Sequence, residues 1–129
     1  MEPQRTHLAI DPTLVGVPGP LAAGRAEATL TATATMAADD RGLVHGGFTF
    51  GLADYAAMLA VNDPNVVLGG ASTRFLAPVT VGEVMVARAE VREEKGKKRV
   101  VAVTVSVGER VVLEGELTCF VLAGHVLDG

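Results

Sequence analysis

The sequence predicts an α+β domain in which an antiparallel sheet wraps around one long central helix. A segment with strand alternation comes first, an apolar run of helical character follows, and four β-rich segments complete the chain. Elements in this order can bury their apolar faces together when the helix lies across the sheet. The 129 residues fit one domain with a single core.

The chain begins with residues 1–23, which are rich in proline and glycine and are predicted to be an irregular lead-in to a single domain at 24–129. Over residues 24–36, small or apolar side chains alternate with polar ones, which is typical of a strand with one buried face. That face comprises Ala26, Ala28, Leu30, Ala32, Ala34 and Met36. Residues 39–42 then predict a turn.

A helix is predicted over residues 46–62 and ends at the Asp-Pro-Asn sequence 63–65. Asp54 is the only charged residue between Gly46 and Val61. A carboxylate removed from water among apolar residues is costly unless something compensates it. Asp54 therefore indicates a functional group or a carboxylate with a specific partner.

Four β-rich segments follow, without a helix signal between them. They span 66–76, 84–94, 98–107 and 110–122 and are separated by turn residues at Pro78, Gly82, Gly96 and Gly108. Within 105–111, a short glycine-containing turn joins two β-branched runs, which predicts a tight hairpin.

Composition argues against several classes of protein. The net charge of −4 and the pI near 5.3 give no broad basic surface, so nucleic acid is not expected as a partner. The apolar run is too short for a membrane span and has an aspartate at its middle, and the N-terminus lacks the pattern of a signal peptide. We expect a cytoplasmic protein with no membrane partner.

Cys119 is the only cysteine, so no internal disulfide can form, and its apolar neighbours favour a buried structural thiol. The histidines, His7, His45 and His125, have no metal-ligand spacing with each other or with the thiol. The sequence therefore predicts neither a metal nor a cofactor.

Two motifs point to a known family. Residues 42–48 (GLVHGGF), followed by Leu52-Ala53-Asp54, resemble the G-x-x-H-G-G…L-A-D signature of hotdog-fold acyl-CoA thioesterases, especially the phenylacetate-pathway type. Residues 75–79 (FLAPV), followed by Gly82-Glu83, are similar to this family's passage between two strands. The resemblance covers roughly residues 24–122 and implies the hotdog fold.

The resemblance also implies hydrolysis of an acyl-CoA thioester to the free acid and CoA. The Gly46 N–H would hydrogen-bond the thioester carbonyl, and Asp54 would act as general base on water or as nucleophile, usually across a dimer interface. His45 would serve mainly for positioning. Gly47 would let the substrate approach the backbone, and Arg74 is a candidate for pairing with a CoA phosphate or with Asp54.

The positions of Gly46 and Asp54 agree with this chemistry on physical grounds. A helix N-terminus has free N–H groups and a partial positive charge, which suit the oxyanion of a tetrahedral intermediate. Eight residues of helix correspond to ~12 Å of rise, so one acyl group cannot easily reach both residues in a single chain. A homodimer, or a homotetramer built from dimers, would bring Gly46 of one subunit to Asp54 of another.

Each site residue also has a structural interpretation. Asp54 could accept a hydrogen bond from a neighbour, His45 could cap or pack at the helix start, and Gly46 and Gly47 could serve only the turn. Two positions depart from the family: Asp39 stands where asparagine is common, and Ala77 where a basic residue is common. The basic cluster Lys95, Lys97, Lys98 and Arg99 could replace that charge, or it could be an exposed hairpin turn.

Two other functions remain open. The C-terminal half, from Phe75 onward, is also similar to the effector domain of the malonyl-CoA-responsive repressor of bacterial lipid synthesis, a hotdog module that binds acyl-CoA without hydrolysing it. Residues 1–23 are too short and too rich in proline to form that regulator's helix-turn-helix. Dehydratase activity would normally require a catalytic histidine in the helix region, whereas His45 precedes the helix. Hydrolysis is the function that the sequence favours.

Overall fold

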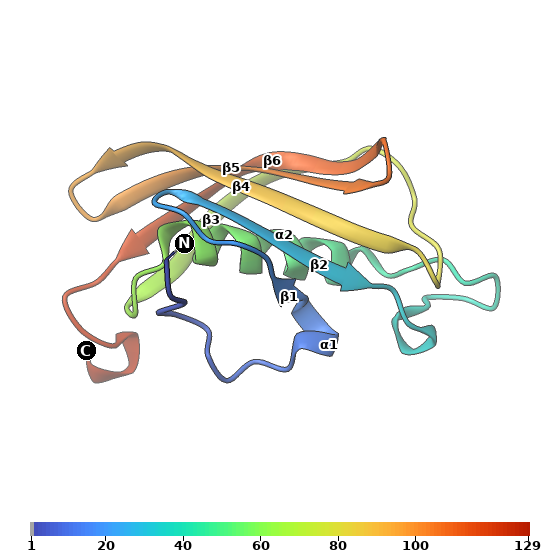
Figure 1. Cartoon of the computed structure of the whole chain (residues 1–129), viewed down its shortest axis with the longest axis horizontal. Coiled ribbons are helices and arrows are strands. Elements are labelled where there is room, and N and C mark those ends of the chain that lie inside the picture. Colours follow the sequence, from blue (N-terminus) through green and yellow to red (C-terminus); the bar gives the residue numbers. More distant parts are fainter. Residues whose placement is uncertain (1) are drawn as a thin grey trace.

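Six strands form one sheet, and the long helix α2 (Gly46–Val61) lies along one face of it (Figure 1). The computed structural model describes residues 2–129. The strand order is β1-β2-β4-β5-β6-β3, and every neighbouring pair is antiparallel. The predicted α+β hotdog architecture, an antiparallel sheet around one central helix, is confirmed.

The strands are β1 (Val17–Pro18), β2 (Arg25–Thr31), β3 (Val66–Phe75), β4 (Val84–Lys95), β5 (Lys98–Val107) and β6 (Arg110–Val121). The four segments predicted after the helix agree with β3 to β6 to within one residue at each end. The predicted hairpin joins β5 to β6, with Val107 opposite Arg110 and Gly108 in the left-handed region at φ 58°.

The second half of α2 is buried on nearly all sides because the sheet curls around it. Its residues from Tyr55 to Ala60 are each at most 5% exposed. A helix that is apolar all round is stable only when it is enclosed in this way. Small side chains at Ala53, Ala56, Ala57 and Ala60 let the strands pack close to the helix axis.

Strand β2 is shorter than the alternating pattern predicted. The apolar face holds as far as Ala32, but the strand ends at Thr31 and Ala34 is exposed. The chain leaves the sheet there and forms a 3-10 turn, Ala34–Met36, which returns Met36 to the core. The alternating pattern did not predict this turn, because alanine and threonine fit both a strand and a turn.

The lead-in contains two short elements and packs against the domain. The helix α1 (Pro12–Val15) precedes β1, which pairs with β2 at the sheet edge. Residues 2–7 lie against the C-terminal end of α2, where the Arg5 N–H donates to Asn62 Oδ1 at 2.7 Å. Position 1 lies outside the described residues.

Strand β3 forms the opposite edge of the sheet and pairs only with β6. A bulge between Leu68 and Gly70 interrupts this pairing. At Gly69, a Cβ would lie 2.3 Å from the Phe120 ring, so this position excludes other residues. The middle of β3, from Gly69 to Ser72, is exposed and leaves its outer edge free for pairing.

Candidate active site

The first turn of α2 is fixed by hydrogen bonds around His45. His45 is the N-cap, and its Nδ1 accepts a hydrogen bond from the Gly47 N–H at 2.8 Å. Its own N–H donates to Met36 O at 2.9 Å, and the Val44 N–H donates to Val79 O at 2.8 Å. The helix start is therefore tied to two separate loops, and the capping role considered for His45 is observed.

Gly46 keeps a free backbone donor. As the first residue of α2, its N–H cannot bond within the helix, and it donates to no acceptor among residues 2–129. The Gly47 N–H differs, because it already donates to His45. A Cβ at position 46 would lie 3.1 Å from the Phe75 ring, so glycine permits the ring to pack directly on the helix start.

Gly46 lies in the wall of a cleft of about 340 Å³ at the start of the helix. The cleft is also lined by Val44, Thr49, Phe75, Pro78 and Val79. Phe75 is 56% exposed, and its ring forms one side of the opening. The arrangement places one backbone N–H and a helix N-terminus beside an apolar hollow, which suits a carbonyl that develops negative charge.

Asp54 lies in the middle of α2, in a different environment. It is half-buried, and its Oδ1 is buried without a hydrogen-bond partner among the described residues. Burial raises the pKa of the Asp54 carboxyl above its ordinary value, and His7 acts in the opposite direction. A carboxylate with a raised pKa and a vacant acceptor atom can take a proton from water.

The ion pair of Arg74 is with a residue other than Asp54. Its guanidinium pairs with Glu114 on the neighbouring strand β6, and the side chain is largely exposed. Asp39 stabilises the turn before α2, since its Oδ1 accepts from the N–H groups of Arg41 at 3.0 Å and Leu43 at 3.1 Å. These contacts give both residues a structural partner.

The basic cluster around residues 95–99 lies at the tip of the β4–β5 hairpin. There Arg99 pairs with Glu94 at 3.0 Å and donates to Gly96 O at 2.7 Å. Within residues 2–129, no three metal-ligating side chains converge on one point. In the same part of the chain, no helix has the length and apolar character of a membrane span.

The structure adds one residue that the sequence did not single out, His7. The lead-in carries it to α2, where its ring centroid lies 6.1 Å from that of Tyr55, the neighbour of Asp54. A single histidine in a proline-rich segment has no periodicity from which its position could be predicted.

Cys119 of β6 is fully buried, as predicted. Burial together with the Asp54 charge raises the pKa of its thiol to about 12.

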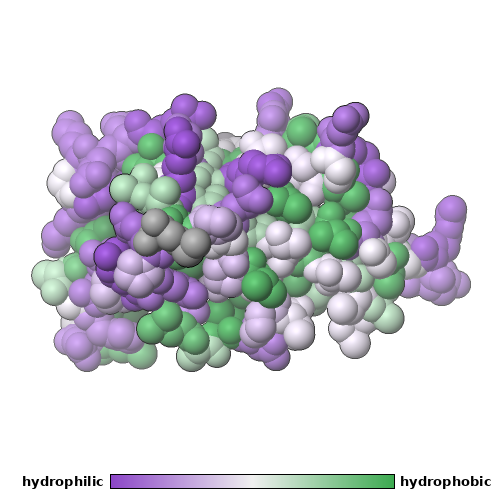
Figure 2. Space-filling model, viewed as in Figure 1, coloured by the Kyte–Doolittle hydropathy of each residue, from purple (hydrophilic) through white to green (hydrophobic). Residues whose placement is uncertain are grey.

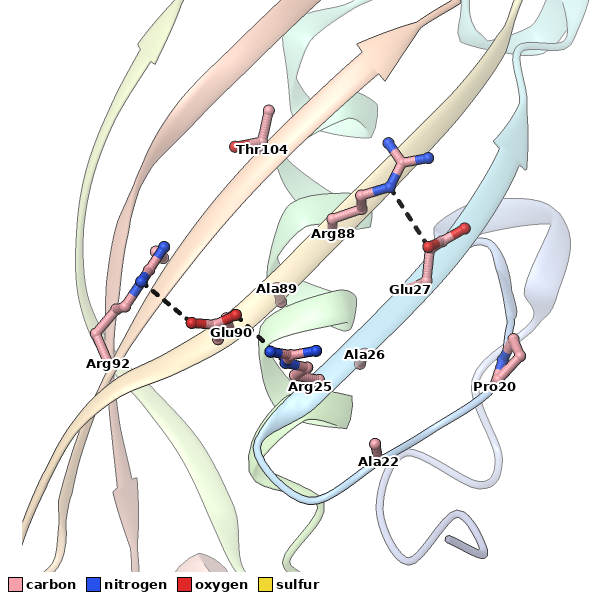
Figure 3. Close-up of a pocket in the computed structure, with 11 residues that line it drawn as sticks. Pro20, Ala22, Arg25, Ala26, Glu27, Arg88, Ala89, Glu90, Arg92 and Thr104 are labelled. Atoms are coloured by element: carbon pink, nitrogen blue, oxygen red, sulfur yellow. Dashed lines mark ion pairs between the residues drawn. The ribbon is translucent and has the colours of Figure 1, made fainter. Parts of the chain in front are cut away.

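A hollow of about 510 Å³ lies on the outer face of the sheet (Figure 3). Its arginines are paired: Arg25 and Arg92 with Glu90 at 3.4 and 3.1 Å, and Arg88 with Glu27 at 3.4 Å. This outer face is the upper side in Figure 1, where long hydrophilic side chains project in Figure 2. The hollow contains neither Gly46 nor Asp54, so it is not the candidate active site.

The comparisons with known proteins agree with the fold. The sequence model of the thioesterase superfamily matches residues 41–114, more than half of the chain, and the chain belongs to this superfamily. The crystal structure of an uncharacterized protein from Pyrococcus horikoshii is 55% identical, with a TM-score of 0.97 over 98% of both chains. The PaaI protein of the Escherichia coli phenylacetic acid degradation operon is 26% identical, with a TM-score of 0.73 over 80% of both.

Two curated relatives are longer than this chain. A protein named methylthioribose-1-phosphate isomerase, from Aquifex aeolicus, is 55% identical over 112 residues, which are 87% of this chain and 25% of that protein. The transcription factor FapR of Caldanaerobacter subterraneus is 32% identical over 74 residues, 57% of this chain and 37% of FapR. The chain thus spans well under half the length of both relatives.

Proposed function

We propose that this protein hydrolyses an acyl-CoA thioester to the free acid and CoA, with Asp54 activating water and the Gly46 N–H stabilising the oxyanion. The observation that carries the proposal is Asp54 Oδ1, a buried acceptor without a partner among the described residues. Such an atom is costly to keep unless it has a use. Membership of the thioesterase superfamily supplies a use that matches its chemistry.

In the proposed reaction, Asp54 takes a proton from water while the water oxygen bonds to the thioester carbon. The carbonyl oxygen becomes an oxyanion beside the Gly46 N–H and the positive end of α2. Collapse of this intermediate breaks the C–S bond, and CoA leaves as a thiolate that takes up a proton. Loss of one oxyanion donor typically raises the barrier by roughly 3–4 kcal/mol.

The carboxylate could instead attack the carbon itself and form a mixed anhydride that water then cleaves. One turnover in ¹⁸O-labelled water can reveal the second route. A general base leaves ¹⁸O only in the acid product, whereas cleavage of an anhydride at the enzyme carbonyl leaves ¹⁸O in Asp54. Asp54 acts on the substrate in both routes.

We infer that the active unit is a homodimer, either alone or within a homotetramer. Gly46 and Asp54 are separated by two turns of the same helix, ~12 Å of rise, so a single carbonyl cannot contact both. The free edge of β3 offers a surface on which a second copy could continue the sheet. Light scattering on the purified chain tests this inference directly.

A cytoplasmic location also stays a prediction.

Release of free thiol from a panel of short, long, aromatic and malonyl CoA esters tests the activity. We expect the parent to turn over at least one ester, and Asp54→Asn to lose a factor of ~10² or more with the fold retained. Asp40→Asn is the matched control, because it removes an exposed carboxylate that lies outside the site. If Asp54→Asn were as fast as the parent, the proposed role of Asp54 would be wrong.

A chain that binds acyl-CoA without hydrolysing it, as a sensor or carrier, is the second candidate. The similarity to FapR favours it, because that relative is named as a transcription factor and not as an enzyme. Absence of turnover across the panel, together with tight binding of a CoA ester by calorimetry, would support this function instead.

A further inference from the structure

The N-terminal segment is held against the end of α2 by a small hydrogen-bond network. Asn62 adopts the left-handed conformation, with φ 54°, where α2 ends. Its Oδ1 accepts from the Arg5 N–H at 2.7 Å, and its Nδ2 donates to Pro3 O at 2.9 Å. Gln4 Nε2 lies 2.9 Å from Thr6 O and 3.3 Å from the hydroxyl of Tyr55. These contacts fix residues 3–6 on the helix that carries Asp54.

His7 comes directly after this anchored segment and is itself in an unusual conformation. Its φ is 55°, in the left-handed region that few residues other than glycine adopt. Such a conformation persists only where surrounding contacts maintain it. The Thr6 hydroxyl provides one contact, at 2.8 Å from His7 Nδ1, and the ring lies 6.1 Å from that of Tyr55. The anchor therefore presents the imidazole to the part of α2 next to Asp54.

The Thr6 hydroxyl can serve His7 in both of its charge states. It can donate to Nδ1 of the neutral ring and can accept from Nδ1–H of the imidazolium. The other ring nitrogen, Nε2, has no hydrogen-bond partner among residues 2–129. His7 can therefore gain a proton without leaving its position.

The charge of Asp54 acts on two titratable side chains from other elements, His7 of the N-terminal segment and Cys119 of β6. Its neighbour on α2, Tyr55, has its ring 6.1 Å from that of His7. Burial raises the pKa of Tyr55 and brings that of Cys119 to about 12, so both stay neutral in acid. His7 is exposed as a whole residue, but partial burial of its ring lowers its pKa, while the Asp54 charge raises it. His125, from the C-terminal segment, lines a hollow together with His7. Among His7, Tyr55 and Cys119, His7 alone can acquire a positive charge as the pH falls.

We propose that His7 is a positioning residue of this active site, whose imidazolium stabilises the ionised form of Asp54 and so keeps the base competent in mild acid. This inference rests on the proposed function, because it assigns the role through Asp54. His7 does not touch the scissile bond in this arrangement. Its effect is expected below pH 6.5, the ordinary pKa of histidine, and is lost in mild alkali where the ring is neutral.

The first test needs no substrate and therefore stands even if the proposed hydrolysis fails. The ring signals of His7, His45 and His125 are titrated by NMR in the parent and in Asp54→Asn, and His7→Gln assigns the first. We expect the midpoint of His7 to move to lower pH in Asp54→Asn, because the favourable negative charge is lost. An unchanged His7 midpoint would overturn the proposal.

The second test is the pH profile of kcat/KM for an ester that the parent hydrolyses. In His7→Gln, we expect the acid limb to move to higher pH, with several-fold less activity than the parent below pH 6.5 and equal activity near pH 8. Asp40→Asn, which removes an exposed carboxylate outside this region, should match the parent throughout. The double variant with Asp54→Asn should be no slower than Asp54→Asn alone. Equal loss at every pH, or full multiplication of the two effects, would contradict a role through Asp54.

Discussion

The first turn and the middle of α2 differ in which kind of polar group lacks a hydrogen-bond partner. At the first turn, His45 and Gly47 satisfy each other, and a single donor, the Gly46 N–H, stays free beside an apolar cleft. In the middle, the Asp54 Oδ1 acceptor is buried and has no hydrogen-bond partner among residues 2–129. One end of the helix thus offers an unused donor, and the other region an unused acceptor.

In the proposed mechanism, the Gly46 N–H and the Asp54 carboxylate are two halves of a site that do not meet within one subunit. Hydrogen bonds from unrelated loops fix the donor half in place. Burial raises the pKa of the Asp54 carboxyl, and the N-terminal segment is anchored beside it on α2. Because Gly46 and Asp54 lie two turns apart on one helix, the proposed mechanism needs a second helix to complete each half of the site.

The largest expected effect comes from combining two inactive subunits. Gly46→Pro removes the free N–H at a helix position that accepts proline, and the extended ψ of His45, 129°, suits a residue before proline. We expect each homodimer, Gly46→Pro or Asp54→Asn, to lose ~10² or more in turnover. A heterodimer of the two retains one intact site and should recover about half of the parental rate.

Gly46→Ala is the matched control for this experiment. It brings the same Cβ against Phe75 but keeps the N–H, so the difference between alanine and proline isolates the donor. The heterodimer is purified with two different tags on co-expressed chains. A heterodimer as slow as either homodimer would show that the two halves are not combined across subunits.

The sequence predicted the architecture well because its signals were local. The four strands after the helix have clear turn residues at their ends, and the helix starts at the histidine and two glycines that the motif contains. The prediction that Ala34 lies on the buried face of a strand was wrong, because small residues fit a strand or a turn equally. His7 could not be placed, because its position depends on Asn62 and Tyr55, contacts more than 45 residues away in the chain. The pairing of Arg74 with Glu114 depends in the same way on strand register.

The second expected effect is on the stability of the folded protein. If the buried, unpartnered Asp54 carboxylate destabilises the fold, Asp54→Asn should raise the free energy of unfolding at pH 8 by roughly 1 kcal/mol, or Tm by about 3 °C. The folded state holds the Asp54 proton more tightly than the unfolded state, so the parent loses stability as pH rises through the raised pKa. Thermal melting at several pH values measures this.

The stability that Asp54→Asn gains should disappear as the pH falls below 3.8, the ordinary pKa of aspartate, because the parent's Asp54 is then neutral like the asparagine that replaces it. Asp40→Asn, at an exposed position, should change Tm little at any pH. A less stable Asp54→Asn at pH 8 would mean that the carboxylate has a favourable partner in the assembled protein. The acceptor half would then be structural.

The smallest expected effect concerns Cys119, the other buried titratable group near Asp54. Burial and the Asp54 charge bring its pKa to about 12, so at pH 8 it is almost wholly a thiol and lacks the nucleophilic form. Iodoacetamide should therefore leave the native protein unlabelled at pH 8 and label the unfolded chain, as mass spectrometry would report. Rapid labelling of the native protein would show that water reaches this part of the core. The raised pKa assigned to Asp54 would then lose its cause, because the same burial accounts for both groups.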